Sequence, residues 1–122
     1  MNFFEARVES VEAGRARVAG AGFRSLDLPA TSMTVGDALT VGVRPEHLAR
    51  DTNGPFAAEG VVELVERLGE SSFAHVRRVD DRLFVAEVRG REAPTPGERM
   101  TLIAAAQDVH VFDASGQRVS AL

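Results

Sequence analysis

Two stretches of this sequence recur later in the chain, and this internal repeat limits the folds that are open to it. Residues 7–12 (RVESVE) are matched by residues 61–66 (VVELVE) at an offset of 54. Further along, residues 35–41 (VGDALTV) are matched by residues 96–102 (PGERMTL) at an offset of 61. Segments that recur in the same order along a chain indicate similar structural units that pack on one another. The sequence therefore predicts two related halves.

The two copies meet at residues 51–55 (DTNGP), a segment with linker composition in which Asn-Gly and Gly-Pro are turn signals. The predicted halves are about residues 1–50 and 56–122. The second half carries the extra length, which we place in longer hairpins around residues 80–81 and 89–96. Because a unit of about 50 residues buries too little surface to be stable alone, we expect the halves to share a core or to exchange strands.

Period-two alternation indicates strands rather than helices. In residues 38–44, Leu39, Val41 and Val43 alternate with other residues, which is typical of a strand with one buried face. Residues 61–68 place apolar residues at helical spacing, so this pattern leaves helix and strand open. The other strand candidates are residues 3–11, 15–18, 23–28, 72–79, 82–88, 100–104 and 109–112. Many short strands predict an all-β chain with little helix, folded as one or two small Greek-key barrels.

Composition excludes several classes of function. The chain has 14 arginines and no lysine, so it lacks the lysine of a phosphate-binding loop or a Schiff base. It has no cysteine for thiol chemistry or thiolate metal sites. A net charge of −4 disfavours nucleic acid and anionic lipid as partners. No apolar run is long enough for a membrane helix and the start has no secretory pattern, so we expect an intracellular protein without membrane insertion.

Residues 41–48 (VGVRPEHL) resemble the signature of the TOBE domain, the C-terminal accessory domain of importer ATPases in the maltose and glycerol-3-phosphate class of ABC transporters. Three other segments agree in the expected order. Residues 1–8 look like the join after the nucleotide-binding domain, and residues 62–70 look like the opening of the second half. Residues 109–113, with Gly116, are similar to the closing strand. The resemblance spans nearly the whole chain.

The resemblance implies a β-barrel of oligonucleotide-fold or MOP-like type that follows an ATPase domain absent from this chain. It also favours a strand over residues 61–68. In the family, the ATPase subunits dimerise, the C-terminal domains help to hold the pair together, and some members receive regulators there. The implied role is a non-catalytic assembly and regulatory domain for uptake of a sugar or a glycerol-3-phosphate-like solute.

The same resemblance implies the partners and the location. The domain would form a homodimer next to its ATPase domain, and the full complex would include transmembrane permease subunits. ATP and Mg²⁺ would bind to the missing domain, so no cofactor is expected in this chain. The protein would be cytoplasmic and peripheral at the cytoplasmic face of the inner membrane.

Arg44, Pro45, Glu46 and His47 form the most distinctive polar cluster. Pro45 fixes its own φ and pushes Arg44 into an extended conformation, so the motif predicts a rigid corner at the end of a strand. Arg44 is free to pair with a carboxylate, for which Glu46 or Glu66 is the candidate. The alternative is that the cluster contacts a partner or ligand.

A second candidate is the loop of Gly69, Ser71 and Ser72, because hydroxyls and backbone N–H groups around a glycine can form an anion-binding nest. This loop gives the alternative function, a module that senses an oxyanion or the transported solute. Glu70 places a negative charge beside the nest. The chain also lacks the Ser-Ala-Arg-Asn entry motif of molybdate-binding modules, of which only Asn2 is present.

Three further groups of residues have simpler interpretations. His47, His75 and His110 lie 28 and 35 residues apart, a spacing that indicates no metal site. Gly20-Ala21-Gly22 matches part of a dinucleotide fingerprint, but without a strand and helix around it we interpret it as a turn. Asp80-Asp81 is expected to be a tight turn rather than a catalytic pair of carboxylates.

The aromatic residues are seven phenylalanines, which we assign mainly to the core because stacking on single-stranded nucleic acid also requires a basic groove. Phe3, Phe4 and Phe112 are the exception. We expect these three to form an apolar patch that the missing ATPase domain or a second copy would cover.

Overall fold

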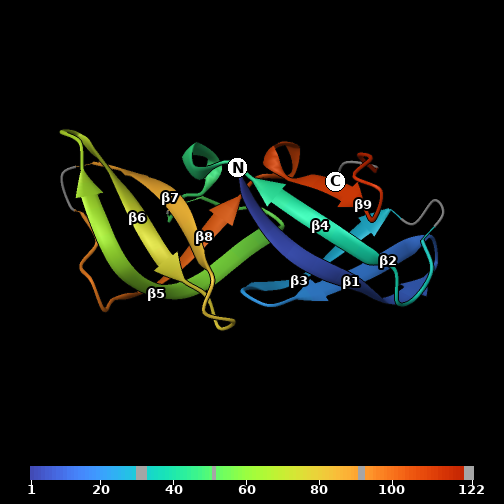
Figure 1. Ribbon diagram of the computed structural model, residues 1–122. Coiled ribbons are helices and arrows are strands. Elements are labelled where there is room, and N and C mark those ends of the chain that lie inside the picture. Colours follow the sequence, from blue (N-terminus) through green and yellow to red (C-terminus); the bar gives the residue numbers. More distant parts are fainter. Residues whose placement is uncertain (30–32, 51, 91–92, 120–122) are drawn as a thin grey trace.

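The computed structural model describes residues 1–29, 33–50, 52–90 and 93–119 (Figure 1). Residue 51 of the expected linker and residues 91–92 of the expected hairpin lie outside these ranges. The described residues form strands and two short 3₁₀ helices, so the all-β prediction is confirmed. The elements are β1 (Asn2–Glu12), β2 (Arg15–Gly20), β3 (Phe23–Pro29), β4 (Ala38–Val43), η1 (Pro45–His47), β5 (Phe56–Arg67), β6 (Ser71–Arg77), β7 (Leu83–Arg89), β8 (Arg99–Ala104), η2 (Ala106–Asp108) and β9 (His110–Asp113).

The repeat in the sequence corresponds to a repeat in strand pairing. β1 pairs with β2 and β4, and β5 pairs in the same antiparallel manner with β6 and β8. The irregularity in register after Val8 of β1 recurs after Val62 of β5, at the repeat offset of 54. Residues 61–67 therefore belong to a strand, which settles the alternative that their spacing left open.

Each half completes its sheet with a segment from the other. β9 follows η2 in the second half but pairs with β4 of the first half. In return, Ala49 follows η1 in the first half and forms an isolated bridge to Ile103 of β8, with N–H···O distances of 3.0 and 2.8 Å. Figure 1 shows the result as two lobes, with β5 to β8 on the left and β1 to β4 with β9 on the right.

The core is continuous across the junction of the two halves. Phe4 of β1 packs against Phe23 of β3, Phe56 of β5 and Phe84 of β7, with ring centroids 5.3 to 5.8 Å apart. All four side chains are buried. Edge-to-face and tilted contacts of this kind add to the stabilisation that comes from buried area. Phe4 therefore belongs to the core, and its predicted place in a surface patch is wrong.

Candidate functional site

The Arg44 cluster has the corner geometry that its proline predicts. Arg44 is extended, with φ −75° and ψ 148°, and Pro45 is the first residue of η1. Within the described ranges, neither Glu46 nor Glu66 forms an ion pair with Arg44, which is exposed. Glu66 instead lies near the end of β5, where its Oε1 is 2.6 Å from His75 Nε2 on β6. A role of this cluster in binding a partner stays a prediction.

His47 lies where the two halves face each other. Its Nδ1 atom is 3.6 Å from Oδ1 of Asp108 in η2, and it is buried without a hydrogen-bond partner. The two residues are 61 positions apart, the offset of the second repeat, so they are equivalent positions of the two copies. This contact joins η1 to η2. In the part of the chain that the structure describes, no three metal-ligating side chains converge on one point.

His110 is paired with Gly42 across β9 and β4. Burial lowers the pKa of His110 from its ordinary value, and the nearby charges of Arg118 and Arg44 lower it further. The imidazole is therefore harder to protonate in the folded chain than in the unfolded chain.

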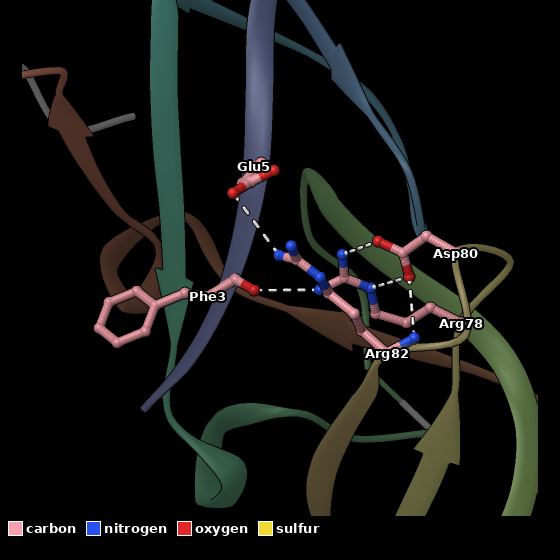
Figure 2. A network of polar contacts seen from close by, with 5 residues as sticks. All are labelled: Phe3, Glu5, Arg78, Asp80 and Arg82. Carbon is pink, nitrogen blue, oxygen red and sulfur yellow. Dashed lines mark hydrogen bonds and ion pairs between the residues drawn. The ribbon is translucent and has the colours of Figure 1, made fainter.

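The most buried charged group in the described residues is one that sequence reasoning missed. The side chain of Arg78, just after β6, is only 2% exposed. Its guanidinium donates to the carbonyl oxygen of Phe3 (Nη1, 3.0 Å) and to both carboxylate oxygens of Asp80 (Nε, 3.0 Å; Nη2, 2.5 Å). The guanidinium carbon also lies 4.7 Å from the centre of the Phe4 ring, a cation–π distance. Figure 2 shows this network at the start of β1.

Two neighbouring contacts attach the same hairpin to β1. Arg82 Nη1 lies 3.6 Å from Glu5 Oε1, with both side chains largely exposed. The Asn2 side chain donates to the carbonyl oxygen of Val85 (2.7 Å) and accepts from the Val85 N–H (2.9 Å). The tip of the β6–β7 hairpin in one half thus holds the first strand of the other. The contact between this hairpin and β1 has only a weak signal in the sequence. That signal is the predicted tight turn at residues 80–81, which is confirmed.

A groove of about 930 Å³ runs over the outer face of β1, β4 and β9. Phe3 and Phe112 line it, with ring centroids 6.4 Å apart in an edge-to-face arrangement, and Phe3 is 55% exposed. They lie over Gly42, where an added Cβ would be 2.6 Å from the sulfur of Met1. The predicted patch is therefore present without Phe4. We call this surface the Phe3–Phe112 groove.

The Gly69 loop connects β5 to β6. Gly69 has a positive φ of 83°, which a turn glycine adopts without strain. Ser72 is buried, and Ser71 lines a small cavity with Glu70, Glu87 and Arg89. Two carboxylates against one guanidinium give this cavity a negative balance. Anion binding at Gly69, Ser71 and Ser72 stays a prediction.

The sequence of this chain matches the models of two known protein families. A family model described as the TOBE domain matches residues 41–112, and one described as the MalK OB fold domain matches residues 1–48. The chain belongs to the TOBE domain family. The predicted family is thereby confirmed, and this TOBE chain carries the oligonucleotide-fold architecture along most of its length. Its described residues include no helix with the length and hydropathy needed to cross a membrane.

Named relatives resemble this TOBE chain over much of its length. The sn-glycerol-3-phosphate import ATP-binding protein UgpC of Chromobacterium violaceum is 33% identical over 119 residues, which cover 97% of this chain and 31% of the relative. The UgpC protein of Chromohalobacter salexigens is 40% identical, with 69% of this chain and 24% of the relative covered. The maltose/maltodextrin import ATP-binding protein MalK of Photobacterium profundum is 37% identical, with 66% and 23% covered. The chain thus spans a quarter to a third of these relatives.

Among solved structures, the cytoplasmic molybdate-binding protein ModG superposes with a TM-score of 0.66. The alignment covers 90% of this TOBE chain and 94% of that chain, at 16% sequence identity. At this identity the likeness establishes a shared fold. It is consistent with the MOP-like architecture that the sequence predicts.

Proposed function

We propose that this chain is the non-catalytic assembly and regulatory domain of an ABC importer ATPase subunit that serves uptake of a sugar or a glycerol-3-phosphate-like solute. The observation that carries the proposal is the match of nearly the entire chain to about a third of an import ATP-binding protein. ATP and Mg²⁺ would bind to the remaining part of the subunit, because these 122 residues contain no lysine for a phosphate-binding loop. Permease subunits would complete the transporter at the cytoplasmic face of the membrane.

The proposed mechanism is coupling rather than chemistry. Two domains that associate keep their ATPase domains at high effective concentration, so closure on ATP becomes an intramolecular event. A regulator that prefers one arrangement of the pair would shift the population toward it. Neither role needs a catalytic group in this chain.

The Phe3–Phe112 groove is the surface we assign to a second copy of the domain. Its aromatic pair supplies apolar area, and aromatic residues such as the exposed Phe3 are enriched in the cores of protein interfaces. Glu5 and Arg7 also line the groove, so it carries charges of both signs. Such a face can pair with itself in a two-fold arrangement, in which a carboxylate of one copy can face the guanidinium of the other.

Replacement of both aromatic residues, Phe3→Ser with Phe112→Ser, is expected to abolish self-association. Static light scattering from low to high micromolar concentration should show the unmodified chain approaching the mass of a dimer, and the double variant staying at the mass of a monomer. Leu64→Ser is the matched control, because Leu64 is a comparably exposed apolar residue that does not line the groove. A monomer throughout for the unmodified chain would contradict pairing by this domain.

A further inference from the structure

A second concave surface lies where the β2–β3 turn faces strands β5, β6 and β8. This cleft has a volume of about 690 Å³ and is lined by four arginines, Arg24, Arg77, Arg78 and Arg99, with Glu59 and Asp81 as the acidic residues. We propose that it binds the phosphate group of a small phosphorylated solute, held by Arg77 and Arg99. This site is separate from the Phe3–Phe112 groove and from the Gly69 loop, and it goes beyond the proposed assembly role.

The register of the sheet brings the two proposed ligands together. Val61 of β5 is directly opposite Arg77 on one side and directly opposite Arg99 on the other. Residues opposite each other in antiparallel strands project from the same face of the sheet. With neighbouring strands about 4.8 Å apart, the Cα atoms of Arg77 and Arg99 are about 10 Å apart, and their long side chains can reach one anion above Val61.

In the part of the chain that the structure describes, Arg24 and Arg78 have side-chain partners, whereas Arg77 and Arg99 do not. Arg24 Nε pairs with Glu59 Oε1 at 2.5 Å, and Arg78 is occupied by Asp80 and Phe3. Among the described residues, no side-chain hydrogen bond or ion pair involves Arg77 or Arg99. Pairing of Arg24 with Glu59 and of Arg78 with Asp80 leaves Asp81 beside Arg77 and Arg99, so the cleft keeps a net positive charge. The chain as a whole is acidic, with a net charge of −4. A locally cationic cleft on an acidic chain is therefore better explained by a ligand than by stability.

The chemistry of the cleft fits a phosphate monoester. A guanidinium presents donors in a planar fork that matches two phosphate oxygens, and two such groups can neutralise a dianion. The volume lies within the range of small-molecule sites. Val79, which is 84% exposed at the rim, offers an apolar contact to a short carbon chain. Gly20 and Gly22 also line the cleft, and at Gly22 an added Cβ would be 2.9 Å from Arg78 Nε.

The test is a calorimetric titration of the 122-residue chain with inorganic phosphate and, separately, with glycerol phosphate at constant ionic strength. We expect saturable binding of glycerol phosphate, and a reduction of about tenfold or more in affinity for Arg77→Gln with Arg99→Gln, because charge-assisted hydrogen bonds are lost. The double variant should remain folded, since the exchange removes two like charges and leaves no buried group unpaired. Equal affinity for both probes would identify phosphate alone as the recognised group. The phosphate site would then be supported, but not the apolar contact with Val79.

Two control variants locate the anion. Arg67→Gln removes an exposed arginine of β5 that does not line the cleft, and Ser71→Ala removes a hydroxyl of the Gly69 loop. Both are expected to bind as the unmodified chain does. The proposal is overturned if neither probe binds more strongly than a chloride control, or if the double arginine variant binds with unchanged affinity. It is also overturned if affinity is lost in Ser71→Ala and not in the double arginine variant. None of these outcomes depends on whether the domain dimerises.

Discussion

Phe4→Ala is expected to lower the free energy of unfolding by about 3 to 5 kcal/mol, the range for truncation of a buried phenylalanine. Phe4 is fully buried and contacts Phe23, Phe56 and Phe84, so its removal leaves a cavity where the two halves meet. These three rings belong to strands of both halves. Strand pairing holds them in place, so they cannot move far enough to fill the cavity. The measurement is urea unfolding followed by circular dichroism.

Phe3→Ala is the matched control for this prediction. Phe3 is the preceding residue and the same side chain, but it is 55% exposed and has a single aromatic partner, Phe112. Exposed positions change stability by much less than core positions, so we expect a loss well under half of that for Phe4→Ala. Similar losses for the two variants would show that Phe4 does not anchor a core shared by the halves.

Arg78→Met is expected to lower the free energy of unfolding by about 3 kcal/mol, at the lower end of the range for breaking a buried charge pair. Methionine keeps an apolar stem against Phe4, so the loss in stability reports the hydrogen bonds and the cation–π contact of the guanidinium. The variant removes the Arg78 donors from Asp80 and from the Phe3 carbonyl oxygen, whereas the Arg82 N–H, 3.2 Å from Asp80 Oδ1, stays in place. Asp80 is 28% exposed, so water compensates part of this loss. The measurement is again urea unfolding, at neutral pH.

Arg82→Met is the control, because Arg82 belongs to the same hairpin but forms an exposed ion pair with Glu5. Exposed pairs contribute about 0 to 1 kcal/mol, so this variant should be close to the unmodified chain. An equal effect of the two substitutions would contradict the assignment of the buried network as the contact that joins the hairpin to β1.

The pH dependence of the Arg78 effect has a defined sign. Hydrogen bonds from Arg78 lower the pKa of Asp80 in the folded chain. A carboxyl with a depressed pKa contributes stability that is fully present above its unfolded pKa of about 3.9 and is lost as the pH falls through the folded pKa. The difference in stability between the unmodified chain and Arg78→Met should therefore narrow below about pH 4. The pKa of Asp113 is also lowered, by hydrogen bonds from Ser115. Because Asp113 is present in both chains, its contribution to the difference in stability between them cancels.

Much of the local structure could be predicted because it depends on short-range patterns. The repeat located β1 and β5 as equivalent strands, and alternation over residues 38–44 located β4 to within one residue. Turn residues placed the hairpin at residues 80–81. Pro45 predicted the corner after β4 through its own fixed dihedral angle. Each of these features is determined within a few residues along the chain.

Alternation along β1 distinguishes Phe4 from Phe3. Phe4 alternates with Glu5 and Arg7 on one strand, and positions 4, 6 and 8 are all apolar. Period two therefore places Phe4 on the buried face and Phe3 on the exposed face, as the structure shows. Phe3 and Phe4 therefore cannot belong to one surface patch, because neighbouring residues of a strand project from opposite faces.

Periodicity and turn chemistry act over short stretches of chain, so the strand class, the two-copy organisation and the turns follow from the order of the residues. Which residues of one copy meet the other depends on the folded chain. Arg78 contacts Phe3 across 75 residues, and Arg77 and Arg99 face Val61 from two different strands. These contacts depend on strand register and on the exchange of β9 between the halves. Register and exchange are set by the packing of the whole core, which no local pattern encodes.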